Sequence, residues 1–352
     1  MYIRGTGNIS PQKTFGDVPF LEEPVLYNGI RLTCIEPDYK DIIDPKMIRR
    51  MSRIIRMGVA AANACLQEAA IPVPDAIITG TAYGCLQDTD LFLTKMVEQK
   101  EELLTPTAFI QSTHNTIGAQ IGLLLKSHNY NNAFVHRGFS FESALLDGIM
   151  LLMENDASNV LVGAIDEITD NSHAILKRFG LYRTAAVSNM DLYSTVSRGT
   201  IAGEGATFFL LAKEPSSHDY AQLNGLATFY KPKDHAETEQ HIVNFLATHS
   251  VHISDIDLVI IGRNGNAKDD AVYDRLTQTI FNTSILANYK NLCGEYPTAA
   301  AFALWLAAGI IKNGIVPAVL NVSNTTGKTM KKILIHNHYQ DTHHSLLLVS
   351  AC

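Results

Sequence analysis

Residues 132–165 carry the pattern that most constrains the fold of this chain. Asn132 to Val135 reads as a short strand, Arg137-Gly138-Phe139-Ser140 as a sharp turn, Glu142 to Asn155 as a helix, and Asn159 to Ile165 as an apolar strand. A continuous apolar strand is typical of a parallel sheet that is covered on both faces. The segment is therefore a β-α-β unit, and its turn lies at a helix N-terminus, where the backbone dipole favours an anion.

Strand and helix patterns on either side of this unit predict a duplicated α/β architecture. Asp44 and Pro45 are typical N-cap and first-turn residues of a helix, and a polar stretch at 214–222 separates two halves that each combine strands with helices. We expect an N-terminal half at 1–215 and a C-terminal half at 216–352. The other expected elements are a short apolar lead at 2–4, helices at 47–59, 116–126, 237–248, 270–280 and 299–312, and strands at 75–81, 257–261 and 345–350.

Composition limits the classes of function. Of the 352 residues, 46% are hydrophobic, which is enough for a sizeable core and excludes intrinsic disorder. The net charge of −7 argues against a nucleic-acid partner. The longest uncharged apolar run, from Thr298 to Ile311, is shorter than the roughly 20 residues of a membrane span. The 5 cysteines are scattered and show no metal-binding spacing, which fits a reducing cytoplasm.

Several motifs follow one another in an order found in one enzyme family. Gly203-Glu204-Gly205-Ala206 is similar to a D-G-F-x-x-G-E-G-A block. Residues 289–300 are similar to a K-S-x-x-G-H-x-x-G-A-A block, and residues 257–270 are similar to a stretch that contains H-G-T-x-T. Over nearly its whole length the chain resembles the β-ketoacyl synthase family of condensing enzymes. The resemblance implies a thiolase-like fold, duplicated and layered α-β-α-β-α, and no cofactor. Further similar segments are 2–11, 50–53 and 105–115.

The three catalytic side chains that the resemblance implies are absent. The family uses a cysteine at the turn as acyl nucleophile, because a helix N-terminus lowers the pKa of a thiol. Two histidines promote decarboxylation and stabilise the enolate. Gapless counting places these positions at Phe139, Gly262 and Glu295, while the lysine of the second block is kept as Lys290. Phenylalanine has no lone pair for attack, and an ionised carboxylate would repel an enolate.

Ser140, on the same turn, is an alternative nucleophile. It would make the chain an active 3-oxoacyl-[acyl-carrier-protein] synthase or an acyltransferase. A serine needs a general base, however, and the loops that should supply one carry Gly262, Asn264 and Glu295. We favour the interpretation that Ser140 caps the following helix. Cys293 or Cys85 is a second alternative, but the surroundings of both are typical of buried structural thiols.

Residues 335–343 replace the glycine-rich loop of the family and place Tyr339 at its gating phenylalanine position. Histidines 336, 338, 343 and 344 could coordinate zinc or copper. The sequence fixes no accompanying Cys, Asp or Glu set, so we expect no metal and interpret the segment as a hydrogen-bonded loop at the mouth of the former active site. We define the vestigial site as Phe139, Ser140, Gly262, Asn264, Lys290, Glu295 and Tyr339.

A chain that keeps the scaffold but lacks the catalytic residues resembles the chain-length factor, the non-catalytic partner of type II polyketide ketosynthases. The resemblance is strongest to the short forms that accompany aryl-polyene and flexirubin-type ketosynthases. The resemblance implies a cytoplasmic protein that forms a heterodimer with an active ketosynthase or a homodimer. The dimer would elongate polyketide or fatty-acid chains that are carried on an acyl carrier protein. Phe139 is expected to plug the subunit's own channel. Residues 105–115 are implied to reach the partner's acyl tunnel, with Phe109, Ile110, Ser112 and Asn115 as tunnel or interface candidates.

Overall fold

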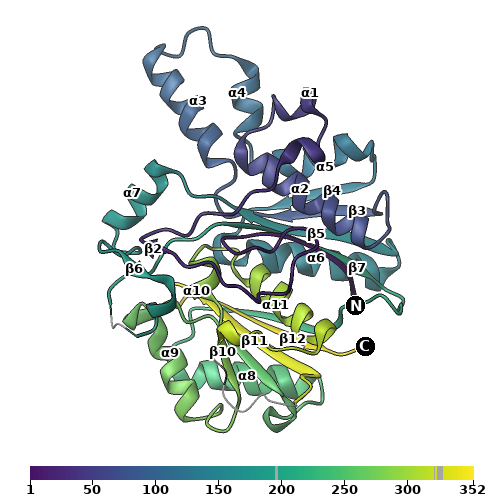
Figure 1. Cartoon of the computed structure of the whole chain (residues 1–352), viewed down its shortest axis with the longest axis vertical. Coiled ribbons are helices and arrows are strands. Elements are labelled where there is room, and N and C mark those ends of the chain that lie inside the picture. The colour runs from purple at the N-terminus through teal and green to yellow at the C-terminus, as the bar shows by residue number, and fades with distance from the viewer. Residues whose placement is uncertain (195–196, 321, 323–327) are drawn as a thin grey trace.

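One sheet of ten strands forms the framework of the chain; this computed structural model describes residues 1–194, 197–320, 322 and 328–352 (Figure 1). The N-terminal half contributes β1 (Tyr2–Ile9), β3 (Ala76–Gly80), β4 (Tyr130–Phe134), β5 (Asn159–Asp166) and β7 (Gly205–Ala212). The C-terminal half contributes β8 (Ala221–Tyr230), β9 (Leu258–Ile261), β10 (Leu286–Asn288), β11 (Lys332–Tyr339) and β12 (His343–Ser350). A separate pair consists of β2 (Asn28–Gly29) and β6 (Val187–Ser188).

The two halves have the same strand order. The N-terminal strands lie in the order β4-β3-β5-β7-β1 and the C-terminal strands in the order β10-β9-β11-β12-β8. In both halves the spatial order is third, second, fourth, fifth and first along the chain, and only the pairings of the fifth strand are antiparallel. An antiparallel pairing of β1 with β8 joins the halves. The expected α/β duplication is therefore present, and we propose that the halves divide near residue 215.

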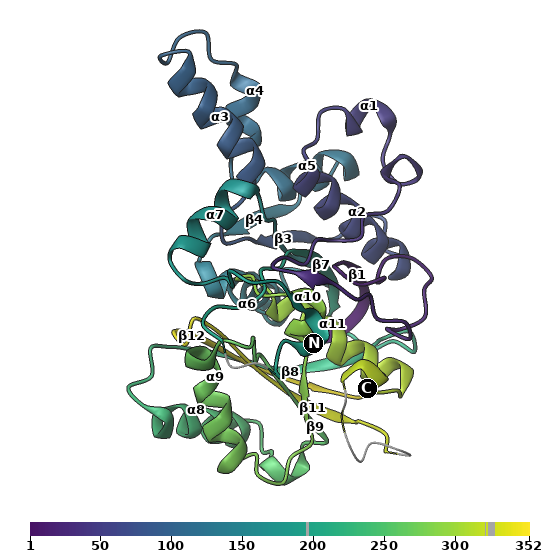
Figure 2. The ribbon, with the colours of Figure 1, turned by 60° about the vertical axis from the view of Figure 1, so that its left-hand side comes forward.

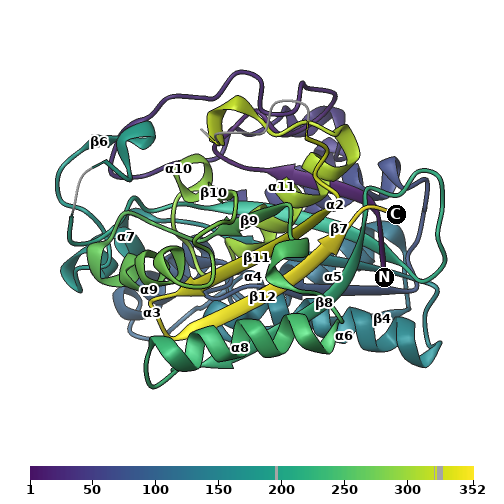
Figure 3. The same cartoon turned by 90° about the horizontal axis from the view of Figure 1, so that it is seen from below.

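Helices on both faces of the sheet complete the expected thiolase-like α-β-α-β-α layers. α6 (Ser140–Glu154) and α11 (Ala300–Asn313) lie in the middle layer, where one hydrophobic cluster unites them with strands of both halves. α2 (Arg53–Glu68) and α5 (Thr116–Leu125) cover the outer face of the N-terminal strands. α8 (His235–Thr248) and α9 (Ala267–Gln278) cover the outer face of the C-terminal strands (Figure 3).

The long apolar run at 298–311 belongs to the middle layer. All residues of α11 from Ala300 to Ile310 are buried, as expected for a helix that is apolar on every side. Its many alanines allow strands to approach it from both directions. In the part of the chain that the structure describes, no helix has both the length and the apolarity of a membrane span.

The helix expected over 47–59 is interrupted. Asp44 does cap α1 (Pro45–Ile48), since its side chain accepts a hydrogen bond from the Lys46 N–H at 2.7 Å. The chain then leaves the helical conformation and resumes it at the start of α2. Met51 lies in the break and is buried, so the apolar spacing continues through a change of backbone direction that it does not reveal.

Two helices form an arm that projects from the body, and we call residues 86–115 the arm (Figures 1 and 2). The sequence patterns did not predict its first helix, α3 (Leu86–Glu98), which is followed by α4 (Pro106–Gln111). Several large apolar side chains of the arm are exposed, which indicates an interaction surface. They are Leu91, Leu93, Val97, Leu103, Phe109 and Ile110. The remaining helices are α7 (Asp170–Arg178), α10 (Lys290–Cys293) and short 3₁₀ turns at 39–41, 137–139, 189–191, 253–255 and 318–320.

Candidate functional site

The turn before α6 is covered by the hairpin of β11 and β12. A Cβ atom on Gly138 would lie 2.7 Å from Cβ of Tyr339 and 2.9 Å from Cβ of His343, so only glycine allows the hairpin to rest on the turn. Phe139 is buried, and its ring centroid lies 4.7 Å from that of His343. The position at which a nucleophile was expected therefore holds an apolar ring packed against the hairpin.

Ser140 does not cap α6, and that prediction was wrong. It is the first residue of the helix, and Phe139 is the N-cap. The buried hydroxyl of Ser140 accepts a hydrogen bond from the His136 N–H at 2.8 Å and donates one to the Arg137 carbonyl at 2.8 Å. The hydroxyl closes the preceding turn, because these two backbone groups lie there. The Ser140 hydroxyl proton is therefore held by the Arg137 carbonyl. The ring of the nearby His136 contacts Ser143 instead, with Nδ1 and Oγ 3.4 Å apart.

Gly262 follows β9 at a point with no room for a side chain. A Cβ atom there would lie 2.3 Å from Oδ1 of Asn337 and 2.8 Å from the hydroxyl of Tyr273. Asn337 cannot easily move away, because its Oδ1 accepts a hydrogen bond from the buried Tyr289 hydroxyl at 2.8 Å. An imidazole at this position would require the whole group to rearrange.

Replacement of Gly262 by alanine is expected to lower the free energy of unfolding by about 1–3 kcal/mol, because the added methyl group overpacks a rigid polar cluster. Urea unfolding measures the effect. Gly29→Ala is the control, since the nearest atom to a Cβ on Gly29 lies 3.9 Å away. Equal stability of the two variants would contradict the proposed crowding.

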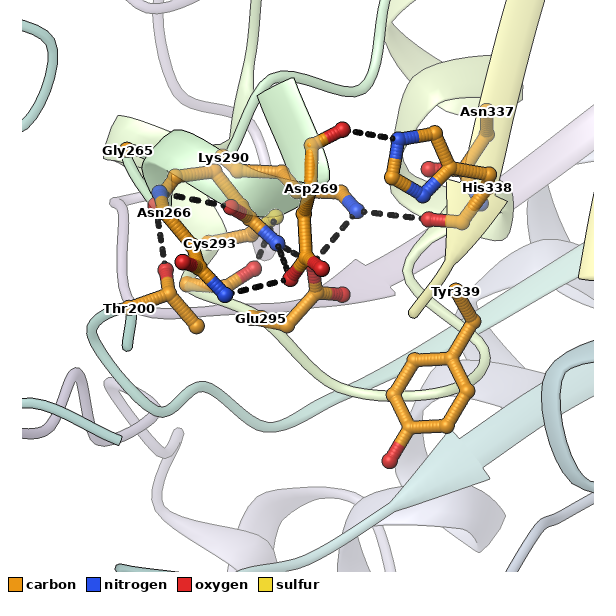
Figure 4. Close-up of polar contacts among 12 residues, drawn as sticks. Thr200, Gly265, Asn266, Asp269, Lys290, Cys293, Glu295, Asn337, His338 and Tyr339 are labelled. Atoms are coloured by element: carbon orange, nitrogen blue, oxygen red, sulfur yellow. Dashed lines mark hydrogen bonds and ion pairs between the residues drawn. The ribbon is translucent and has the colours of Figure 1, made fainter. Parts of the chain in front are cut away.

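Glu295 and Lys290 form a buried ion pair in the vestigial site (Figure 4). Lys290 Nζ lies 2.7 Å from Glu295 Oε2, and the Asn264 Nδ2 donates to the same oxygen at 2.7 Å. Lys290 is fully buried and also donates to the His338 carbonyl at 3.3 Å. Burial raises the pKa of Glu295, and the Lys290 charge and the Asn264 amide oppose this rise. Both charged groups thus have partners within the protein.

The loop at 263–270 is held by its own side chains. The Asp270 carboxylate accepts hydrogen bonds from the backbone N–H groups of Asn264 and Gly265, at 2.8 and 2.9 Å. Asp269 Oδ2 accepts from the side-chain amide of Asn266 at 2.8 Å, and the Thr200 hydroxyl donates to the Asn264 carbonyl. The loop therefore presents Asn264 to Glu295 in a fixed orientation.

Little space remains between these groups. A cavity of about 10 Å³ lies beside Glu295, Asn264 and Tyr339, which is room for one water molecule. The Tyr339 hydroxyl lies 3.2 Å from that of Tyr83, so the expected gate position is fixed to the N-terminal half. The structure thus brings Gly262, Asn264, Lys290, Glu295 and Tyr339 together. Four further residues of this site were not predicted from the sequence, because no shared motif connects them. They are Tyr83, Tyr182, Thr200 and Asp269.

The histidine-rich segment is not a loop, and that interpretation was wrong. His336 and His338 lie in β11 and His344 lies in β12, and all three are fully buried. His336 Nε2 lies 3.3 Å from His344 Nδ1, and His338 Nε2 lies 2.8 Å from the Asp269 carbonyl. Burial lowers the pKa values of His336 and His338 well below the ordinary range. Among the described residues, no group of three or more His, Cys, Asp or Glu side chains is placed to hold a metal ion.

Glu142, in the first turn of α6, is buried with little compensation. Among the described residues neither carboxyl oxygen has a hydrogen bond of normal geometry. Burial raises the pKa of Glu142 from 4.5 to about 7, and Ser345 and the Lys290 charge only partly offset the effect. A carboxyl whose pKa is raised on folding destabilises the folded state when ionised. This loss of folding stability begins as the pH rises above 4.5, the ordinary pKa, and is complete above about pH 7, the pKa in the folded state.

Glu142→Gln is therefore expected to raise the free energy of unfolding by about 3 kcal/mol at pH 8 and by less than about 1 kcal/mol at pH 5. Denaturant unfolding at both pH values measures this difference. Glu154→Gln, at the exposed end of the same helix, is the control and should change little. A gain that does not depend on pH would contradict the raised pKa.

The four residues implied to contact a partner all lie on the arm, Phe109 and Ile110 on α4 and Ser112 and Asn115 at its base. Phe109 and Ile110 are 56% and 60% exposed, and the Phe109 ring packs on Phe92 with centroids 5.6 Å apart. The Ser112 hydroxyl donates to the Phe109 carbonyl, which ends α4. Asn115 is the N-cap residue of α5, without a side-chain capping bond.

Comparison with known proteins agrees with this architecture. Residues 35–201 match the family model described as beta-ketoacyl synthase, N-terminal domain. Among the curated proteins no sequence matches the chain. A beta-ketoacyl synthase from Burkholderia phymatum STM815 has a similar structure, with a TM-score of 0.82 and 13% identity, over 100% of this chain and 99% of that one.

Two further solved structures are similar over the whole chain. One is the ketosynthase ApeO in complex with its chain length factor ApeC from Xenorhabdus doucetiae (TM-score 0.77, 14% identity, 100% of this chain and 98% of that one). The other is AntDE with AntF, a type II acyl-carrier protein in complex with its ketosynthase (TM-score 0.75, 14% identity, 100% and 99%). Residues 35–201 are therefore similar to the N-terminal domain of beta-ketoacyl synthases, and the chain as a whole has the thiolase-like fold of the ketosynthases.

Proposed function

We propose that this chain is a non-catalytic, chain-length-factor-like subunit that pairs with an active ketosynthase in type II polyketide or fatty-acid elongation. The observation that carries the proposal is the Lys290–Glu295 ion pair, which stands where the family places its second histidine. A carboxylate that is bound to Lys290 and Asn264 through Oε2 has no N–H donor with which to stabilise an enolate. With Phe139 at the nucleophile position, neither acyl transfer nor decarboxylation has its catalytic group.

The size of the former active site supports the same proposal. A condensing site must hold an acyl thioester and a malonyl group, whereas the cavity beside Glu295 has a volume of about 10 Å³. Phe139 is buried against the hairpin of β11 and β12, and Tyr339, at the end of β11, is buried as well. We propose that Phe139 plugs the channel of this subunit, so that the growing chain stays in the partner.

The edge of the sheet beside α6 supports dimer formation. β4 is the last strand of the sheet and, among the described residues, pairs only with β3, which leaves its other edge open for an incoming strand. On α6, Leu146, Met150 and Met153 are 49%, 47% and 64% exposed and share one face of the helix. We call β4 and these three side chains the dimer surface. An open strand edge beside an apolar helical stripe suits a second ketosynthase-like subunit, which would present the same elements.

The arm is the proposed route to the partner's acyl tunnel. Phe109 and Ile110 are exposed apolar residues on a projecting element, where a partner subunit can cover them. We propose that these two side chains, with Ser112 and Asn115 at the base of α4 and α5, limit the length of the acyl chain. An aryl-polyene-type product, a cytoplasmic location and an acyl-carrier-protein substrate for the complex are further parts of the proposal.

Co-expression with a candidate ketosynthase, followed by affinity purification of that partner and size exclusion, tests this function. The proposal predicts a stoichiometric complex of the two chains. A chain that remains monomeric, or that forms only a homodimer with each ketosynthase tested, would leave the chain-length role without a mechanism. Carrier-protein-loaded substrates added to the isolated chain should give no condensation product.

A further inference from the structure

A large cavity lies where β1 loses its second neighbour, and its lining includes no residue of the vestigial site. β1 pairs with β8 only through Tyr2 and Ile3, so beyond these residues no strand in the described part of the chain pairs with this edge of β1. The cavity has a volume of about 810 Å³ and lies along this edge, between α2, α11 and the loop at 13–22. In Figure 2 the purple loop lies on the same side of the molecule as α2 and α11. This volume is within the range of small-molecule sites.

The apolar wall of the cavity depends on a contact between the loop and α11. Phe20 packs edge-on against Trp305, with ring centroids 5.3 Å apart. A Cβ atom on Gly309 would lie 2.4 Å from the Phe20 ring, so glycine at this position admits the loop residue. Trp305 is nearly buried beneath this contact, and together the two rings offer an aromatic surface to a ligand.

One buried polar group in the cavity wall has no partner. Asn8 of β1 is only 2% exposed, and its Oδ1 accepts a hydrogen bond from the Thr207 hydroxyl at 2.8 Å. Among the described residues its amide Nδ2 forms no hydrogen bond. An unpaired buried donor is costly, and a hydrogen-bond acceptor on a ligand would satisfy it.

Carboxylates dominate the charged residues around the cavity. Lys13 is the only cationic residue among the described lining residues. Its Nζ lies 3.6 Å from Oε2 of Glu23, a residue that does not line the cavity. Such an excess of negative charge attracts cations and repels anions. The lining carboxylates are Asp17, Glu22, Asp41 and Glu68.

We propose that this cavity binds an amphipathic organic amine that also carries a hydrogen-bond acceptor. The apolar part of the ligand packs on Trp305 and Phe20, and the acceptor takes the free Asn8 donor. The ammonium group lies among the carboxylates of the loop and α2, and gains from a cation–π contact with the aromatic wall. This site is independent of the proposed pairing with a ketosynthase, because it shares no residue with the dimer surface or the arm.

Trp305 is the only tryptophan in the chain, so its fluorescence reports on the cavity directly. We would titrate the purified protein with three matched probes: phenylalaninol, which is cationic; phenylpropanediol, which is neutral; and phenyllactate, which is anionic. All three have a phenyl ring and a hydroxyl group and do not emit with tryptophan. Saturable quenching by phenylalaninol, with a dissociation constant below about 1 mM and about tenfold tighter than for the other two, is expected.

Two variants locate the binding site. Ala64→Phe, which fills the cavity from α2, should abolish the response. The double variant Asp17→Asn with Glu22→Gln should weaken phenylalaninol binding about tenfold and leave phenylpropanediol unchanged, while Glu101→Gln with Glu102→Gln on the arm is the charge-matched control. Thermal melting verifies that each variant is folded. The proposal is overturned if no probe quenches Trp305, if phenyllactate binds as tightly as phenylalaninol, or if folded Ala64→Phe protein binds unchanged.

Discussion

Replacing Lys290 by methionine should lower the free energy of unfolding by about 3–5 kcal/mol. The side chain of Lys290 is fully buried, and its Nζ lies 2.7 Å from the Glu295 carboxylate. Without the lysine, Glu295 keeps only the Asn264 amide as a partner, and its charge remains buried. Denaturant unfolding at neutral pH measures the loss.

The matched double variant separates the ion pair from simple packing. Lys290→Met combined with Glu295→Leu removes both charges and should recover most of the lost stability, because apolar pairs of similar volume often replace buried ion pairs without penalty. Lys95→Met, on α3 of the arm, where the lysine is only partly buried, is the control for the substitution itself. If the effects at Lys290 and Glu295 simply add, the two side chains do not stabilise each other and the assigned role of the pair is wrong.

Charged side chains on the dimer surface should abolish complex formation. Met150→Asp with Met153→Asp introduces two carboxylates into the apolar face of α6, beside the open edge of β4. Because burying unpaired charges in an interface costs several kcal/mol, binding to a ketosynthase should weaken about 100-fold or more. Size exclusion of the co-expressed pair and titration of the purified chains measure this change.

Val243→Asp is the control for this experiment. Val243 is 47% exposed on α8, on the outer face of the C-terminal half, and so matches the exposure of Met150 on another face of the molecule. The control variant should bind the ketosynthase like the wild type. Equal binding by both variants would place the dimer interface elsewhere.

Much of the fold was predictable, because most elements have a local apolar pattern. The β-α-β unit at 132–165 matches β4, α6 and β5 within a few residues, and the run at 298–311 matches α11. The arm was not predicted, since α3 leaves Leu91, Leu93 and Val97 exposed and so lacks a simple apolar face.

The candidate site was only partly predictable. Motif spacing located Gly262, Lys290 and Glu295, but it did not reveal that Glu295 pairs with the lysine of its own block. The contact of Gly138 with the hairpin joins segments about 200 residues apart, and no local signal encodes it. Ser140 illustrates the same limit, because a serine at a helix start can bond either to the helix or to the preceding turn.

Intact-mass measurement of both chains of the co-purified complex tests the central claim most directly. The complex is incubated with acyl carrier protein loaded with acyl and malonyl groups, and the mass of each chain is then determined. The account predicts an acyl adduct on the ketosynthase chain and an unmodified mass for this chain. A stable acyl adduct on this chain, on Ser140 or Cys293 for example, would contradict it.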